Sequence, residues 1–221
     1  MVGLVPIKAQ LESLDQTSLA QQVINPVDDS VPYLGENGSE IVIVEFGDYQ
    51  CIHCSNFNRD VKDLLMSEYV DTGQAKFIYK DFPINDKETK LSTLAAEASY
   101  CAAEQDKYWE YHDELFRNVK RDSDKDWVNL ENLREFASAV GVVNGTQFES
   151  CLNSHKYVEL VNENELLART LEIPSTPSFI IAKMNDNGTA TAAGNLILVI
   201  GEHPYTTFGE TISLIDNMGN S

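Results

Sequence analysis

Residues 41–46 (IVIVEF) form a nearly continuous run of apolar, mostly β-branched side chains. Such a run is typical of a central strand that is covered on both faces, and it favours a fold that combines a sheet with helices. A segment with helical character follows, and the sequence Cys51-Ile52-His53-Cys54 lies where the strand gives way to that helix. The fold must therefore bury this strand and place its carboxyl end beside a helix N-terminus.

The remaining elements follow a simple order: β-α-β, then a block of helices, then β-β-α. The predicted elements of the first and last parts are 54–69 (helix), 75–80 (strand), 178–183 and 196–201 (a β-hairpin) and 204–217 (helix). The predicted helices of the block are 91–104, 106–118, 127–140, a short helix through Cys151 that begins in a capping box at 146–149, and 155–171.

This order predicts an α/β fold in which a helical insertion separates a βαβ half from a ββα half. Residues 32–85 and 172–221 would form the sheet-containing domain, and residues 86–171 would form the helical insertion domain. Residues 1–31 precede both as an N-terminal leader with a modest helical pattern. With 221 residues the chain is long enough to bury a sizeable core.

Two cysteines separated by two residues at a strand-to-helix junction can close a small disulfide. The same position stabilises a thiolate, because the N–H groups and the dipole of a helix N-terminus favour negative charge. Cys51 is the expected exposed nucleophile, and Cys54, one turn inside the helix, is the expected buried thiol that resolves a mixed disulfide. The alternatives are half of a zinc site or an inert disulfide. Cys101 and Cys151 lie too far apart in the sequence to form the second half of a zinc knuckle.

The composition excludes one class of partner and favours one kind of compartment. The formal net charge is −19, so nucleic acid, which requires clustered Lys and Arg, is not an expected partner. No apolar run is long enough to span a bilayer, and the first residues lack a secretory-signal pattern. The even count of 4 cysteines suits an oxidising environment. We therefore expect an extracytoplasmic protein (secreted, periplasmic-like or membrane-anchored) whose signal or anchor is absent from this sequence, with a cytosolic protein as the alternative.

Four motifs occur along the chain in an order that one family shares. They are residues 45–54 (EFGDYQCIHC), 79–83 (YKDFP), 105–113 (QDKYWEYHD) and 175–179 (STPSF). On these residues, and over roughly 32–217, the chain resembles the DsbA-like thiol–disulfide oxidoreductases. The resemblance implies a thioredoxin fold interrupted by a helical insertion. The chain departs from the family pattern at Ile52, because a proline is often found inside the C-x-x-C.

Side chains around the cysteines have expected roles. His53 would stabilise the Cys51 thiolate, either as an imidazolium or through a hydrogen bond. A carboxylate inside an apolar strand needs a role or a partner. The resemblance implies that Glu45 is a buried acid that passes a proton to or from Cys54. Lys80, at the end of the next strand, would be its charge partner in this proton relay.

A proline at the start of a strand completes the expected site. The resemblance implies that Pro177 follows a cis peptide bond and faces the C-x-x-C. The backbone of Thr176 would then pair with an extended substrate. Ser175, Thr176, Pro177 and Ile52 are the expected substrate-binding residues.

We expect Cys101 and Cys151 to form a structural disulfide inside the helical insertion. Both lie on predicted helices among apolar neighbours at helical spacing, which directs both sulfurs toward the interior. Some DsbA-like proteins carry an extra disulfide in this region, so the resemblance agrees. The alternative is two buried free thiols that pack as small hydrophobic groups. His112, in the same part of the chain, is expected to be a packing or surface residue rather than a catalytic one.

Together these features predict a monomeric thiol–disulfide oxidoreductase that introduces disulfide bonds into extracytoplasmic proteins through a mixed disulfide at Cys51. Its redox centre would be the Cys51–Cys54 disulfide, with no bound cofactor and no metal. Its partners would be unfolded or folding proteins that contain cysteines, and a membrane or soluble redox partner for recycling. A reductase or isomerase with the same site stays open, as do a peptide-binding holdase with structural cysteines and a zinc-binding domain.

Overall fold

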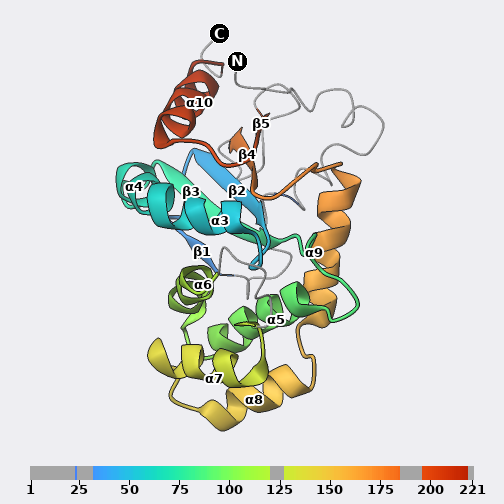
Figure 1. Cartoon of the computed structure of the whole chain (residues 1–221). Coiled ribbons are helices and arrows are strands. Elements are labelled where there is room, and N and C mark those ends of the chain that lie inside the picture. The colour runs from blue at the N-terminus through green and yellow to red at the C-terminus, as the bar shows by residue number, and fades with distance from the viewer. Residues whose placement is uncertain (1–22, 24–31, 120–126, 185–195, 219–221) are drawn as a thin grey trace.

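The computed structural model describes residue 23 and residues 32–119, 127–184 and 196–218. The expected leader, apart from Val23, and the expected turn between the last two strands lie outside the described residues. Figure 1 shows a central sheet with helices beside it and a further group of helices beyond one end. In the part of the chain that is described, no helix is both long and apolar enough to cross a membrane.

Among the described residues the sheet has five strands, in the order β1-β3-β2-β4-β5. Their bounds are β1 Tyr33–Leu34, β2 Ile41–Gly47, β3 Ala75–Asp81, β4 Ser178–Lys183 and β5 Leu196–Ile200. Strand β2 pairs in parallel with β3 and antiparallel with β4, which forms the predicted hairpin with β5. This arrangement confirms the expected α/β fold, a thioredoxin fold with a helical insertion between its two halves.

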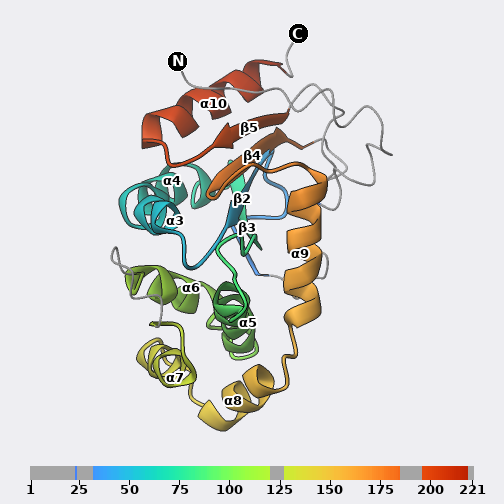
Figure 2. The same cartoon turned by 45° about the vertical axis from the view of Figure 1, so that its right-hand side comes forward.

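Alternation along β2 decides which helices its side chains meet. Ile41 and Ile43 pack with side chains of the helix after β2 and of α10 (Tyr205–Met218), whereas Val42 and Val44 pack with the end of α9 (Val158–Thr170). The sheet is therefore covered on both faces, and Figure 2 shows α9 on the side away from α3 and α10. All seven residues of β2 are buried, as expected for a central strand.

One helical rod, the crossover helix, connects β2 to β3. It consists of α3 Ile52–Phe57, η1 Asn58–Lys62, α4 Asp63–Leu65 and η2 Met66–Val70, in which η1 and η2 are π-helical. Phe57 and Leu65 bury its inner side against the sheet. The predicted helix is confirmed, but it begins two residues earlier, directly after Cys51.

Five helices lie between β3 and β4 in the described part of the sequence. Their bounds are α5 Leu91–Ala103, α6 Tyr108–Arg117, α7 Leu130–Ala139, α8 Gly145–Asn153 and α9 Val158–Thr170. The first four surround a core that contains Tyr111, Leu133 and Phe148. Helix α9 falls within the expected helical insertion (86–171), but Leu167 and Ala168 near its end pack on the sheet. It therefore belongs to both the helical block and the layer that covers the sheet.

Two of these helices begin at asparagines. Asn129 Oδ1 accepts a hydrogen bond from the N–H of Asn132 (2.9 Å), and Asn144 Oδ1 accepts one from the N–H of Gln147 (3.0 Å). The predicted capping box, which placed Thr146 at the N-cap, is wrong. Asn144 is a strong N-cap residue that reaches the third N–H of α8, so the helix begins before Thr146.

A disulfide joins Cys101 on α5 to Cys151 on α8, with a Cα–Cα distance of 5.8 Å. Both residues are buried in the core of the helical block. The bond spans a sequence separation of 50 residues. It therefore ties two helices that are distant in the chain and restricts the unfolded state.

Removal of this disulfide should lower the free energy of unfolding. For a separation of 50 residues, chain-entropy arithmetic gives a loss of roughly 4 kcal/mol. We expect this loss when Cys101→Ala/Cys151→Ala is added to a Cys51→Ala/Cys54→Ala background, measured by urea denaturation. A reductant should weaken the background protein to a similar degree and leave the four-alanine variant unchanged. Equal stability of the two proteins without reductant would contradict the prediction.

Candidate active site

Cys51 and Cys54 lie where the carboxyl end of β2 meets the N-terminus of α3. Cys51 is the N-cap residue: its N–H donates to the carbonyl oxygen of Asp48 (2.9 Å), and its carbonyl oxygen accepts from the N–H of Ser55 (3.1 Å). Among the described residues no side chain caps this helix end, so its first N–H groups are available to the Cys51 sulfur. Cys51 is 8% exposed, Cys54 is fully buried, and both are free thiols.

The surroundings of the Cys51 sulfur stabilise a negative charge. A hydrogen bond from the Cys54 thiol has the largest effect, and burial of the sulfur acts in the opposite direction. The nearby side chain of Thr176 and hydrogen bonds from the backbone N–H groups of Cys54 and His53 add to the stabilisation, and the pKa of Cys51 falls to about 6. Cys51 is therefore mostly a thiolate at neutral pH, which is the form that attacks a disulfide.

Cys54 has the opposite tendency. Burial raises the pKa of Cys54 well above its usual value, and the hydrogen bond to Cys51 and the negative charges of Cys51 and Glu45 raise it further. Cys54 therefore stays protonated at neutral pH and can donate its proton to the Cys51 thiolate. The two sulfurs form a pair with one reactive thiolate and one protonated thiol.

The loop before β4 approaches the reactive sulfur. The Cys51 sulfur lies 3.3 Å from the carbonyl oxygen of Thr176, to which its thiol form donates a hydrogen bond, and the Thr176–Pro177 peptide bond is cis. Both Thr176 and Pro177 are buried, whereas Ser175 and Ile52 are partly exposed. The structure thus brings Thr176 to the Cys51 sulfur from a distant part of the chain. Ile52 follows Cys51 directly in the sequence.

Glu45 lies on the face of β2 that meets the helix carrying the cysteines, and it is 1% exposed. Its Oε1 has no hydrogen-bond partner among the described residues. Burial raises the pKa of Glu45 well above its usual value; the positive charge of Lys62 opposes this, and the negative charges of Cys51 and Asp113 reinforce it. A buried acid with a raised pKa that interacts electrostatically with Cys54 is suited to proton transfer with that thiol.

The expected pairing of Glu45 with Lys80 is wrong. In the parallel register Glu45 lies opposite Tyr79, whereas Lys80 lies opposite Phe46. Neighbouring residues of a strand point to opposite faces of the sheet, so Lys80 points away from Glu45. Its Nζ instead donates to Asn164 Oδ1 on α9 (3.4 Å), and burial lowers the pKa of Lys80 to about 8.

The His53 side chain points toward the surface, where 64% of it is exposed. Its Nδ1 lies 2.9 Å from Glu202 Oε2, which also accepts a hydrogen bond from Asn56 Nδ2 at 3.0 Å. The group that His53 contributes to the Cys51 sulfur is its backbone N–H. This group belongs to the backbone, so it does not bear on the expected role of the imidazole, which stays a prediction.

Sequence reasoning missed a buried polar cluster that links α6 to the crossover helix. Lys62 is buried and donates to Asp113 Oδ1. His112 is also buried, with Nδ1 3.0 Å from the Tyr49 hydroxyl; burial, helped by the positive charge of Lys62, lowers the pKa of His112 to about 3, so the ring is neutral. The one signal in the sequence was the spacing of Lys62 and Met66, which places them on the same face of the helix, and Met66 is buried. A lysine at that spacing can equally remain in solvent, so the signal did not distinguish a buried charge.

The pairing of the cysteines disfavours the alternative of a zinc site with four cysteine ligands. Cys101 and Cys151 are joined to each other and are not free to complete a zinc site with Cys51 and Cys54. Within the described ranges, no group of three or more His, Cys, Asp or Glu side chains is arranged to hold a metal ion.

Comparisons with known proteins agree with this geometry. The family model described as Thioredoxin matches residues 28–194, which is more than half of the chain. Disulfide bond formation protein D of Bacillus subtilis is 26% identical over 150 residues, which cover 68% of this chain and 67% of that protein.

Solved structures share the fold. The crystal structure of alpha-DsbA1 from Wolbachia pipientis has a TM-score of 0.74 at 24% identity and covers 90% of this chain and 96% of that one. The crystal structure of oxidised BdbD from Bacillus subtilis has a TM-score of 0.68 at 23% identity, with coverage of 86% and 95%. The chain therefore belongs to the thioredoxin family, in which it is a DsbA-like thiol–disulfide oxidoreductase.

Proposed function

We propose that this protein introduces disulfide bonds into proteins that contain free cysteines, and that Cys51 is the sulfur that reacts with them. The observation that carries the proposal is the contrast between two neighbouring thiols: Cys51 is the N-cap of α3 and has a lowered pKa, whereas Cys54 is fully buried and has a raised pKa. Stabilising the Cys51 thiolate stabilises the reduced protein, which makes the disulfide form a stronger oxidant. The name of the Bacillus subtilis relative, a disulfide bond formation protein, supports the same direction.

The proposed reaction starts from the Cys51–Cys54 disulfide. A substrate thiolate attacks Cys51 Sγ, forms a mixed disulfide and breaks the Cys51–Cys54 bond. Cys54 leaves as a thiolate and takes the proton of the Glu45 carboxyl. A second substrate thiolate then attacks the substrate sulfur of the mixed disulfide and releases Cys51 as its low-pKa thiolate. Two electrons pass from the substrate dithiol to the cysteine pair, without a bound cofactor.

The substrate backbone is proposed to lie along the loop before β4. The Thr176 carbonyl oxygen is 3.3 Å from Cys51 Sγ, so a peptide whose cysteine reacts with Cys51 must pass beside it. Pairing of an extended peptide with backbone groups of Thr176 would be largely independent of side-chain sequence. Pro177, Ser175 and Ile52 would border the same peptide. This arrangement suits an enzyme that acts on many unfolded or folding proteins.

Two further proposals concern the surroundings of the enzyme. A membrane or soluble redox partner must re-oxidise the Cys51–Cys54 pair after each reaction. An extracytoplasmic location is supported by the buried Cys101–Cys151 disulfide, because such bonds persist in oxidising compartments. If the location is correct, an alkylating agent added to cells before lysis should leave Cys101 and Cys151 unlabelled.

Oxidation of a reduced, unfolded protein tests the proposed function directly. The oxidised wild type should convert substrate thiols to disulfides, and Cys51→Ser should not. Cys54→Ala should instead accumulate mixed disulfides with the substrate, seen on non-reducing gels and by mass spectrometry. A Cys51→Ser variant that still suppresses substrate aggregation, beside a wild type that oxidises nothing, would favour the holdase alternative. A reduction potential near that of thioredoxin, about −270 mV, would favour the reductase alternative.

Alkylation of the reduced protein should separate the two cysteines. The rate at Cys51 should rise as the pH increases through about 6, because the thiolate forms there, whereas Cys54 should stay unreactive since its pKa is raised. Peptide mapping after brief treatment with iodoacetamide measures both rates, and the joined Cys101 and Cys151 provide an internal unlabelled control. Equal labelling of Cys51 and Cys54 at mildly acidic pH would contradict the assignment.

Glu45→Gln should slow the attack of Cys54 on a mixed disulfide held at Cys51, because proton transfer at Cys54 loses its carrier. A loss of about 10²-fold is expected for a single general acid–base group. In the wild type, this rate should rise as Glu45 loses its proton with increasing pH, and the glutamine variant should lack that rise. Rapid mixing and acid quenching measure the rate.

The matched control is Glu97→Gln. Glu97 is a buried carboxyl on α5 whose Oε1 lies 3.0 Å from His155 Nδ1, in the helical block. This variant should keep the wild-type rate and pH profile. An unchanged profile in Glu45→Gln would remove Glu45 from the mechanism.

A further inference from the structure

Lys62, the last residue of η1, is a lysine whose side chain is only 4% exposed. A buried ammonium group is unfavourable unless it is paired. Its Nζ donates to Asp113 Oδ1 and lies 5.5 Å from the centre of the Trp109 ring, and both of these residues are on α6. The positive charge is therefore held by the helical block, although the crossover helix carries the lysine.

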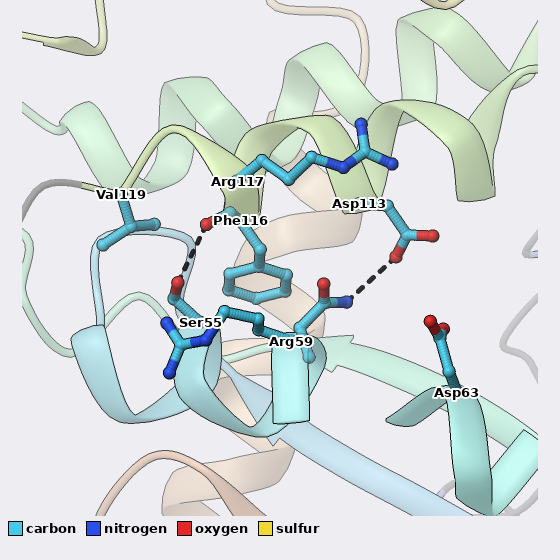
Figure 3. Close-up of a pocket in the computed structure, with 8 residues that line it drawn as sticks. Ser55, Arg59, Asp63, Asp113, Phe116, Arg117 and Val119 are labelled. Atoms are coloured by element: carbon cyan, nitrogen blue, oxygen red, sulfur yellow. Dashed lines mark hydrogen bonds between the residues drawn. The ribbon is translucent and has the colours of Figure 1, made fainter. Parts of the chain in front are cut away.

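Asp113 is itself held in place and is partly open to solvent. Asn58 Nδ2 donates to the same Oδ1 at 2.9 Å. The Asp113 side chain is 29% exposed and lines a pocket between the crossover helix and α6, where Figure 3 shows it pointing toward the crossover helix. Burial acts to raise the pKa of Asp113, but the adjacent His112, the charge of Lys62 and hydrogen bonds from Asn58 and Lys62 hold it below its usual value. Asp113 is therefore a carboxylate at neutral pH.

The Lys62–Asp113 pair acts electrostatically on Glu45. Lys62 Nζ lies over Trp109, whose ring packs on Phe77, two residues before Tyr79 on the same face of β3. Tyr79 and the uncharged Phe179 of β4 are the partners of Glu45 across the sheet. The charged groups that act on Glu45 are Lys62 from η1, Asp113 from α6 and Cys51, and Glu45 in turn acts on Cys54. Of the charges among them, Lys62 has the largest effect and favours the carboxylate form of Glu45, and Asp113 acts in the opposite direction. His112, the neighbour of Asp113, is neutral and adds no charge.

We propose that Lys62 and Asp113 are positioning residues for the redox step: a charge pair, shared between the crossover helix and the helical block, that controls the protonation of Glu45 and through it the proton on Cys54. The inference rests on the proposed role of Glu45 in disulfide exchange. Lys62 favours release of the Glu45 proton. Asp113 holds the ammonium group in place and cancels part of its charge.

A purely structural ion pair would join α6 to η1 without acting on Glu45, and the two roles predict different outcomes. Removing the charge of Lys62 should make Glu45 harder to deprotonate. Removing the charge of Asp113 leaves Lys62 unopposed and should make Glu45 easier to deprotonate. Loosened packing alone would not move the two variants in opposite directions.

The test is the pH profile of Cys54 attack on a mixed disulfide at Cys51, measured in the full chain. The part of the profile that belongs to Glu45 is identified by its absence in Glu45→Gln. Relative to the wild type, that part should move to higher pH by about 1 unit in Lys62→Met and to lower pH in Asp113→Asn, because a nearby unit charge shifts a pKa by about this amount. Lys62→Arg, which keeps the charge, should restore the wild-type profile.

A second measurement follows the Glu45 carboxyl itself, by ¹³C NMR of the reduced protein labelled at glutamate. The midpoints should fall in the order Lys62→Met, wild type, Asp113→Asn, from highest to lowest pH. The matched control is Asp63→Asn, which removes a carboxylate from the same pocket without removing a charge that acts on Glu45. Its profile and midpoint should equal those of the wild type.

Two outcomes would overturn the inference and leave the proposed function intact. In the first, the wild type oxidises its substrate with a step that depends on Glu45, but Lys62→Met and Asp113→Asn keep the wild-type profile. In the second, both variants move in the same direction. A wild type that oxidises thiols without any dependence on Glu45 would refute the basis of the inference, and a wild type that oxidises none would refute the proposed function.

Discussion

Stabilisation of a negative charge on the Cys51 sulfur is the interaction on which the rest of the site depends. The sulfur is nearly buried, so the thiol of Cys54 and N–H groups at the start of α3 take the place of water around it. The position of α3 depends in turn on β2, whose residues are all buried and whose carboxyl end leads into the helix. The core beneath the site therefore holds a helix terminus against one sulfur, and the difference between the two thiols follows from that placement.

Two buried polar networks lie at the ends of the parallel strands β2 and β3, and alternation along β3 turns Lys80 away from Glu45. Glu45 faces the cysteines, whereas Lys80 and Asp81 belong to a second network that includes Asn164 and Tyr100. The Tyr100 hydroxyl donates to Asp81 Oδ2 at 2.6 Å, and burial raises the pKa of Asp81 to about 6. A shift of one residue along a strand moves a side chain to the other face of the sheet. The register of β2 and β3 therefore determines that a helix, rather than β3, supplies the cation that acts on Glu45.

Helix α6 connects the helical block to the redox centre through buried contacts. The carbonyl oxygen of Phe116 accepts a hydrogen bond from Ser55 Oγ at 2.8 Å, one residue after Cys54, and Asp113 accepts one from Lys62. Tyr111, on the same helix, packs against Phe148 of α8 in the core that contains the disulfide. The helical block thus stabilises the start of α3 and contributes charge to the surroundings of Glu45.

Local patterns in the sequence by themselves determined the order of the elements and the location of the cysteine pair. The strand predicted at 41–46 is Ile41–Gly47 and that at 75–80 is Ala75–Asp81, because hydrophobic periodicity and turn signals act over a few residues. The cation that acts on Glu45 was decided only by the tertiary structure, since strand register turns Lys80 away and the crossover helix buries Lys62. The direction of the His53 imidazole likewise depends on Glu202, which lies 149 residues later in the chain. Such contacts join residues that are far apart in the sequence, and no local pattern carries information about them.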